Sequence, residues 1–184
     1  TKRRTNIYLV VDVSGSMAGE KLEDAQAALR IFVDQIQNAE ERVGLIAFSS
    51  DVEEPVPLTQ LGSGREALHR SIDTLVATGG TALLDGVDLA ATKLQDLNDA
   101  ERINAIVVMT DGQENRSRVN LGALTERLRR TQGTDTPIVV FCIAYGRDAD
   151  MRTLEEISSA AGGFTRHGDL ETIRELYRTL STYF

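Results

Sequence analysis

Apolar residues form two kinds of pattern along this chain, short continuous runs and repeats with the period of a helix, and the two kinds alternate. Buried strands are predicted where the apolar runs are short and continuous, at residues 5–11, 43–48, 104–110 and 137–144. Between them, apolar residues repeat at the spacing of amphipathic helices. These predicted helices cover residues 21–37, 65–75, 81–97, 121–130 and 150–161, and a last one begins near residue 170.

Two weaker strand segments complete the predicted sheet. Residues 52–58 contain Pro55 and Pro57, which cannot donate to a strand ladder, so this strand belongs at an edge. The short link before it indicates a hairpin, so we expect the edge strand to be antiparallel to its neighbour. Residues 163–166 are predicted as a short strand. Because strands alternate with helices, the fold class is α/β, an open and mainly parallel sheet with helices on both faces.

The most informative polar run follows the first predicted strand directly. In Asp12-Val13-Ser14-Gly15-Ser16, a carboxylate and two hydroxyls stand at alternating positions, and Gly15 allows the chain to turn sharply between the serines. Such hard oxygen donors suit Mg²⁺, Mn²⁺ or Ca²⁺. Alone, the run also fits an ordinary polar turn.

Two further segments carry similar oxygen donors. Thr81 follows a glycine pair and is expected at or near the N-cap of the next helix, where its hydroxyl can cap the helix or bind a cation. Asp111 ends the apolar strand of residues 104–110 and precedes a glycine. Ligands of parallel sheets bind at the carboxyl ends of strands, near the switch in strand order. Asp12 and Asp111 both stand at such ends.

These motifs, in this order, resemble the metal-ion-dependent adhesion site of von Willebrand factor type A domains. Asp12, Ser14 and Ser16 match the D-x-S-x-S element of that family. Thr81 matches its separate threonine, and Asp111 matches its later aspartate in a T-D-G setting. No position departs from the family pattern, and the resemblance covers nearly the whole chain. It implies a Rossmann-like sheet that carries a complete metal site.

The resemblance also implies a function, which is noncatalytic binding or adhesion to another protein. By this resemblance Ser14 and Ser16 coordinate the cation directly, whereas Asp12, Thr81 and Asp111 alternate between direct and water-mediated contact. An acidic side chain of the partner completes the coordination. We expect Mg²⁺, with Mn²⁺ or Ca²⁺ as alternatives, and no enzymatic activity.

Two other functions remain open at this point. Some relatives are accessory domains of ATPase or metal-chelatase-like assemblies; the ATPase would lie elsewhere, because this chain has no Walker A motif. The second alternative is a metal hydrolase with Asp12 as nucleophile. Phosphoaspartate hydrolases, however, place a second aspartate where Ser14 stands.

Composition narrows the class of protein and of partner. The chain has 184 residues, of which 41% are hydrophobic and 26% charged, which fits one domain over residues 1–184. Its net charge of −8 argues against nucleic acid as a partner, and its basic clusters are residues 1–4 and residues 127–130, the latter on a solvated helix face. Cys142 is the single cysteine and lies in a predicted buried strand, so no intrachain disulfide forms.

The first predicted strand begins almost at the start of the sequence, so we expect a domain cut from a longer polypeptide. No apolar run is long enough to span a membrane, so direct insertion of this segment is not expected. An extracytoplasmic location, or anchoring through segments outside this sequence, is favoured over a cytoplasmic one.

Several polar residues beside these motifs have two readings. Asp85 either steadies the metal loop or interacts with the helix dipole. Glu114 and Asn115 either contact a ligand or are solvated loop residues. Residues 62–65 lack the G-K-[ST] ending of a phosphate loop and are predicted as a turn before a helix.

Overall fold

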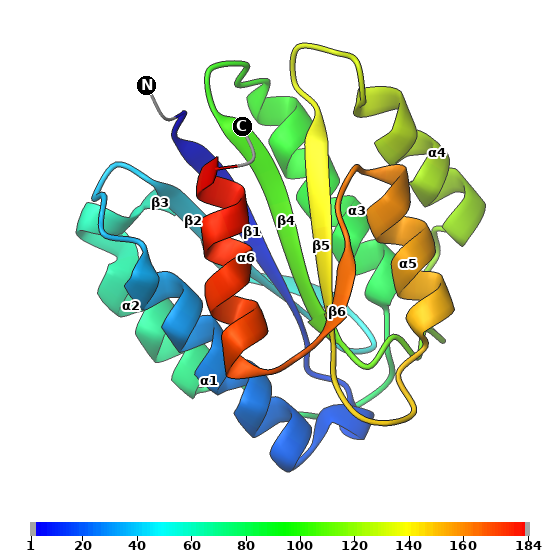
Figure 1. Cartoon of the computed structure of the whole chain (residues 1–184). Coiled ribbons are helices and arrows are strands. Elements are labelled where there is room, and N and C mark those ends of the chain that lie inside the picture. Colours follow the sequence, from blue (N-terminus) through cyan, green and yellow to red (C-terminus); the bar gives the residue numbers. More distant parts are fainter. Residues whose placement is uncertain (1–2, 183–184) are drawn as a thin grey trace.

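The structure, a computed structural model, describes residues 3–182 and contains one six-stranded sheet (Figure 1). The strands lie in the order β3-β2-β1-β4-β5-β6. Their bounds are β1 Thr5–Asp12, β2 Arg42–Phe48, β3 Val52–Gln60, β4 Ile103–Thr110, β5 Ile138–Ala144 and β6 Thr165–His167. All neighbouring strands are parallel except β2 and β3. The predicted fold class is therefore confirmed, including the antiparallel edge strand.

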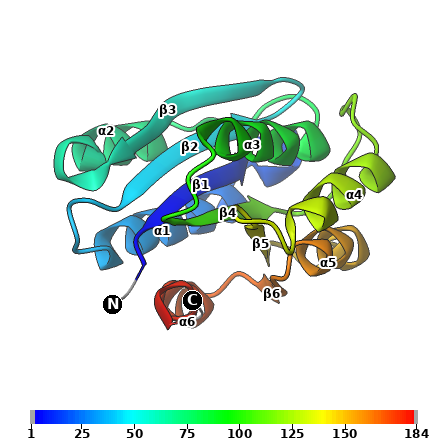
Figure 2. The same cartoon turned by 90° about the horizontal axis from the view of Figure 1, so that it is seen from above.

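Helices cover both faces of this sheet, as Figure 2 shows from above. Their bounds are α1 Glu20–Gln35, α2 Leu61–Asp73, α3 Leu83–Leu97, α4 Leu121–Thr131, α5 Met151–Ala160 and α6 Leu170–Thr182. One core cluster joins α1, α2 and α6 to one face, and a second joins α3, α4 and α5 to the other.

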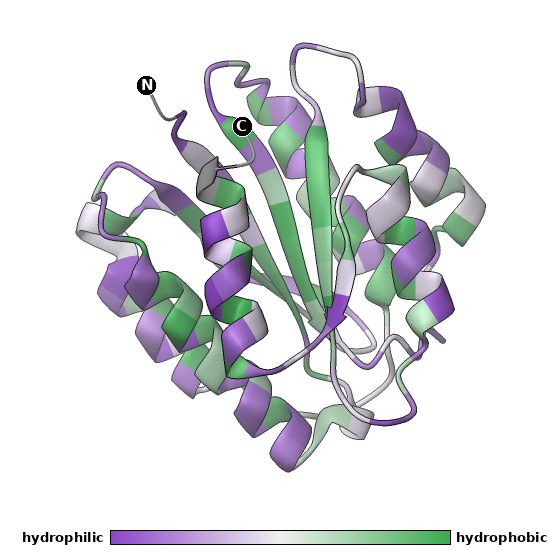
Figure 3. Ribbon diagram, viewed as in Figure 1, coloured by the Kyte–Doolittle hydropathy of each residue, from purple (hydrophilic) through white to green (hydrophobic). Residues whose placement is uncertain are grey.

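The continuously apolar sequence of β1 follows from its central position in the sheet. Successive side chains of a strand point to opposite faces. Ile7 and Leu9 accordingly lie in the cluster with α1 and α6, whereas Tyr8 and Val10 lie in the cluster with α3. Because both faces are covered, every position of β1 is buried. Figure 3 shows β4 and β5 as similarly hydrophobic strands.

The start of α2 corrects one prediction. Residues 62–65 lie inside the helix, which begins at Leu61 directly after β3, rather than in a turn before it. The N–H groups of Leu61 and Gly62, which have no partner within a helix, donate to the carbonyls of Glu41 and Ala39, each at 2.9 Å. These bonds to the preceding loop allow the helix to begin four residues earlier than the apolar period predicted.

The C-terminal elements differ in smaller ways. The short strand covers Thr165–His167 rather than residues 163–166, because the Gly163 amide donates to the Ser158 carbonyl of α5 at 2.8 Å instead of to the sheet. In α6, Ile173 and its apolar neighbours one and two turns later are buried as predicted, but Leu170 is 49% exposed because it begins the helix.

Three composition-based expectations can be compared with the described residues. Cys142 is fully buried, and burial raises the pKa of its thiol to about 12. In the second basic cluster, Arg129 and Arg130 are largely exposed beside Glu126, whereas Arg127 pairs with Asp88 at 2.5 Å. Residues 1 and 2 of the first cluster lie outside the described part. Among residues 3–182, no helix has the length and apolar character needed to cross a membrane.

Candidate metal centre

The candidate centre lies at the carboxyl edge of the sheet, where the strand order switches between β1 and β4. Asp12 is the last residue of β1 and Thr110 the last of β4, and both are fully buried. Asp12 Oδ2 accepts a hydrogen bond from Thr110 Oγ1 at 2.7 Å, and Asp12 Oδ1 accepts one from the Ser14 amide at 2.9 Å. The two strand ends therefore fix the orientation of the carboxylate.

The two serines lie together after this carboxylate. Ser14 Oγ and Ser16 Oγ are 3.0 Å apart; Ser14 is fully buried, whereas Ser16 is exposed. The sequence predicts that Gly15 allows the sharp turn, but Gly15 does not adopt a left-handed conformation. The turn is made instead by a short 3₁₀ helix, η1 (Gly15–Met17). It brings both hydroxyls to the same side as the Asp12 carboxylate.

A second loop is joined to the first by backbone hydrogen bonds. The Gly15 amide donates to the Gly79 carbonyl at 2.9 Å, and the Thr78 amide donates to the Val13 carbonyl at 2.8 Å. This contact places residues 78–81 beside the serines.

Thr81 lies in this second loop, one residue before the N-cap of α3 and so near it, as predicted. The N-cap of α3 is Ala82, and Thr81 is 3% exposed. The Thr81 amide donates to Asn115 Oδ1 at 2.8 Å, while its carbonyl accepts from the amides of Asn115 and Arg116. Because a third loop takes both backbone groups, Thr81 precedes the helix and its hydroxyl does not cap it.

The third loop, residues 111–120, supplies the missing caps of α3. Glu114 Oε1 accepts from the Leu84 amide at 3.1 Å, and Ser117 Oγ accepts from the Asp85 amide at 2.9 Å. In return, the Asp85 carboxylate accepts from the amides of Arg118 and Val119 at 2.9–3.0 Å. Glu114 thus holds the loop to α3, Asn115 holds it to Thr81, and Asp85 steadies the same loop.

We expect Asp85→Ala to lower the free energy of unfolding by about 1–2 kcal/mol, because two loop amides lose a charged acceptor. Urea denaturation measures this change. Asp96→Ala, at an exposed position of the same helix, is the matched control and should change stability by less than about 0.5 kcal/mol. Equal stability of the two variants would contradict the role of Asp85 in the loop.

Asp111 stands at the start of the third loop and is fully buried. Its Oδ1 accepts from the Gln113 amide at 3.2 Å, whereas its Oδ2 has no hydrogen-bond donor within the described residues. The Lys21 ammonium of α1 lies 3.5 Å from Oδ2. Gly112 has a φ of +78° and packs against Asp150, which closes the loop behind the carboxylate.

The electrostatics of the centre follow from burial. Burial raises the pKa of the Asp12 carboxyl above its ordinary value, and the negative charge of Asp111 acts in the same direction. Hydrogen bonds from Ser14 and Thr110 oppose that shift. Two buried carboxylates at one strand switch form a site of concentrated negative charge. A bound cation would lower the cost of keeping both ionised.

The donor chemistry of the centre fits a hard divalent cation. Its donors are two carboxylates and three hydroxyls, on Asp12, Ser14, Ser16, Thr81 and Asp111. Over residues 3–182, no group of three His, Cys, Asp or Glu side chains is placed to hold a metal ion, so three of the five donors in this set are hydroxyls. Oxygen donors alone are typical of Mg²⁺, Mn²⁺ and Ca²⁺ sites.

All the predicted site residues therefore lie at one edge of the sheet, Asp12 at the end of β1 and the others on three connected loops. Sequence reasoning missed two residues, Thr110 and Lys21. Thr110 had a signal, because it directly precedes Asp111 at a strand end. Lys21 had none, because an N-terminal helix lysine is ordinarily solvated.

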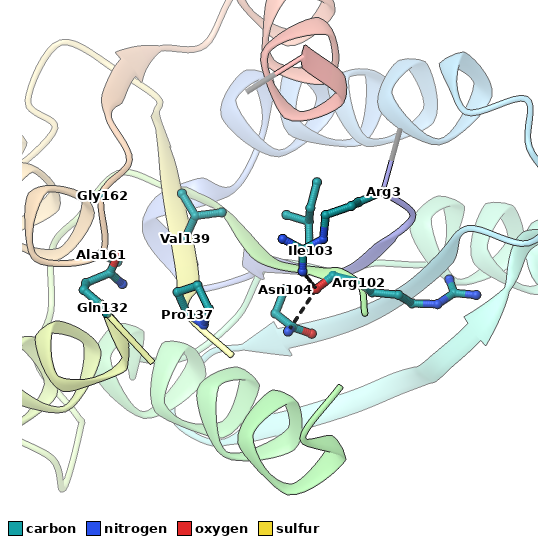
Figure 4. A pocket seen from close by; sticks show the side chains of 10 residues that line it. Arg3, Arg102, Ile103, Asn104, Gln132, Pro137, Val139, Ala161 and Gly162 are labelled. Carbon is teal, nitrogen blue, oxygen red and sulfur yellow. Dashed lines mark hydrogen bonds between the residues drawn. The ribbon is translucent and has the colours of Figure 1, made fainter. Parts of the chain in front are cut away.

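A separate cavity of about 290 Å³ lies at the opposite edge of the sheet (Figure 4). Arg3, Arg102 and Asn104 line it, beside the starts of β4 and β5. The Arg3 guanidinium donates to the carbonyls of Ala100 and Arg102, and Asn104 donates to that of Asp99. These polar groups support the backbone, and the cavity is remote from the buried carboxylates.

Comparison with known proteins identifies the family. Residues 6–179 match the model of the von Willebrand factor type A domain. This chain belongs to that family. The described fold, with its switch between β1 and β4, is a von Willebrand factor type A (VWA) fold.

Similar proteins contain this VWA domain within longer chains. An uncharacterised protein of Synechocystis sp. is 28% identical over an alignment that covers 96% of this chain and 41% of that protein. Inter-alpha-trypsin inhibitor heavy chain H4 of Homo sapiens is 27% identical, over 93% of this chain and 19% of the relative. The chain thus spans less than half the length of these relatives.

Solved structures agree in fold. A von Willebrand factor type A protein from Catenulispora acidiphila superposes with a TM-score of 0.78 at 21% identity, over 97% of this chain and 42% of that one. Manganese-loaded TRAP protein of Plasmodium vivax gives a TM-score of 0.73 at 16% identity, over 97% of this chain and 74% of that one.

Proposed function

We propose that this VWA domain is a noncatalytic module that binds another protein through a divalent cation. The cation is Mg²⁺, with Mn²⁺ or Ca²⁺ as alternatives. An acidic side chain of the partner completes its coordination. The proposed ligands are the oxygen donors of the three loops, namely Asp12, Ser14, Ser16, Thr81 and Asp111.

The observation that carries this proposal is the pair of fully buried carboxylates at the strand switch. Asp12 and Asp111 are both inaccessible to solvent, and Asp111 Oδ2 has no hydrogen-bond donor within residues 3–182. Buried carboxylates are stable where they are paired or bind a metal. The three hydroxyls beside them are neutral donors, so a bound divalent cation would keep affinity for a further anion.

The surface of the site allows a partner to approach. Ser16 and Gly79 are exposed on two of the loops, whereas Asp12, Ser14 and Asp111 are buried beneath them. A protein carboxylate would therefore reach the cation from the side of Ser16. In this arrangement the sheet edge holds the cation and the exposed loops select the partner.

Family membership supports the same function at a coarser level. The relatives include heavy chains of an inter-alpha-trypsin inhibitor, and one protein of similar fold, the TRAP protein of Plasmodium vivax, has been solved in a manganese-loaded form. Binding to other proteins is a common role of this family.

A peptide-display selection on the immobilised domain tests the proposal. We expect selection in Mg²⁺ to enrich peptides that contain Asp or Glu, and EDTA to release at least about 90% of them, because the peptide carboxylate is held by the metal. Exchange of the enriched acid for Asn or Gln should abolish binding. Peptides that lack an acid, or that remain bound in EDTA, would contradict the metal bridge.

A further inference from the structure

We infer that Lys21 is an internal cation that competes with the divalent metal for Asp111 and thereby sets the metal affinity of the site. This inference rests on the proposed function and extends it to a residue outside the ligand set. Lys21 lies in the first turn of α1, the helix that begins at the bottom of Figure 1, at the same edge of the sheet as the candidate metal centre.

The first argument is the ion pair itself. Lys21 Nζ lies 3.5 Å from Asp111 Oδ2, the oxygen that no hydrogen-bond donor reaches within the described residues. The Lys21 side chain is 30% exposed, whereas the Asp111 carboxylate is fully buried. A charge pair of this kind is screened less by solvent and salt than one on an open surface.

The second argument is the space provided for the lysine. Gly146, in the loop after β5, has a φ of +85° and no side chain. A Cβ at this position would lie 2.5 Å from Lys21 Cε and 3.0 Å from Nζ. The lysine stem therefore passes directly over Gly146, and the fold leaves room for the ammonium beside Asp111.

Competition follows from the charges. The divalent cation and the Lys21 ammonium would both be attracted to the buried carboxylate of Asp111. Because both are positive, they would repel each other at this short distance. A hollow of about 460 Å³ adjoins Lys21, and Glu20 and Asp24 contribute to its lining. When the metal binds, the ammonium can move into this hollow and remain near carboxylates.

Removal of the ammonium should therefore strengthen metal binding. We expect Lys21→Met, which keeps most of the side-chain length, to lower the dissociation constant for Mg²⁺ about tenfold in calorimetric titration. Lys21→Arg keeps the charge and should remain close to wild type. The matched control is Lys93→Met. Lys93 pairs with Glu54 of the edge strand β3 at 3.6 Å, so its removal should leave the Mg²⁺ affinity unchanged.

A second readout follows the lysine directly. The sequence contains three lysines, Lys2, Lys21 and Lys93, so ¹³C-labelled lysine side chains give few NMR signals. Addition of Mg²⁺ should shift the Lys21 signal as its ammonium leaves Asp111, while the Lys93 signal stays in place.

The outcomes separate this inference from the function on which it rests. Tighter Mg²⁺ binding by Lys21→Met, with a metal-dependent Lys21 shift, supports competition. Measurable but equal affinities in wild type and Lys21→Met overturn the inference and leave the metal site standing. Weaker binding by the variant also overturns it, because Lys21 would then assist the metal. Absence of Mg²⁺ binding in both proteins overturns the site and the inference together.

Discussion

Asp12→Asn is expected to weaken Mg²⁺ binding by about a hundredfold or more, because it removes one of two carboxylates that would face the cation. Asparagine has nearly the same shape, and its Oδ1 can still accept from the Ser14 amide. Burial raises the pKa of Asp12, so its charge is costly in the fold without a cation. Without added metal, the variant should therefore be at least as stable as wild type.

Calorimetric titration and urea denaturation measure the two halves of this prediction. The control is Asp34→Asn, at an exposed position where Asp34 pairs with His69 at 2.8 Å, and it should bind Mg²⁺ as wild type does. Unchanged Mg²⁺ affinity in Asp12→Asn would remove Asp12 from the ligand set. Global unfolding of Asp12→Asn would show that the carboxylate serves the fold rather than a metal.

Gly163→Ala is expected to lower the free energy of unfolding by about 3 kcal/mol or more, because overpacking against a rigid backbone cannot be relieved. A Cβ at Gly163 would lie 1.8 Å from the Val140 carbonyl oxygen in β5. The neighbouring Phe164 packs against Phe141 in a tilted arrangement, with ring centroids 4.7 Å apart, and its carbonyl accepts from the Cys142 amide. If residues 163–164 moved away from β5, this hydrogen bond and ring contact at the start of β6 would be lost.

Gly122→Ala is the matched control, with an effect of opposite sign. Gly122 is the second residue of α4, and a Cβ there would meet only Asn120 Oδ1, at 3.5 Å. Alanine should stabilise this helix by about 0.5 kcal/mol. Urea denaturation of both variants measures the difference. A stability loss of less than about 1 kcal/mol in Gly163→Ala would contradict the close approach to Val140.

The central layers of the fold could be predicted from the sequence because their side chains follow a local period. In β1, Ile7 and Tyr8 point to opposite covered faces, so the strand reads as one apolar run. The proline pair of β3 likewise placed that strand at an edge, where it lies. The starts of helices were predicted less accurately, as in α2, because hydrogen bonds to residues outside the helix determine where it begins.

The candidate site likewise has features that the sequence determined and features that only the tertiary structure decided. The sequence by itself determined that Asp12 and Asp111 end neighbouring apolar strands, since a parallel sheet brings such ends to one edge. Only the tertiary structure decided that Thr81 precedes α3, because its backbone bonds to a loop 34 residues away. It also decided that Lys21 reaches Asp111 across a glycine. Periodicity sets the face on which a side chain lies, whereas the packing of distant loops sets which group it meets.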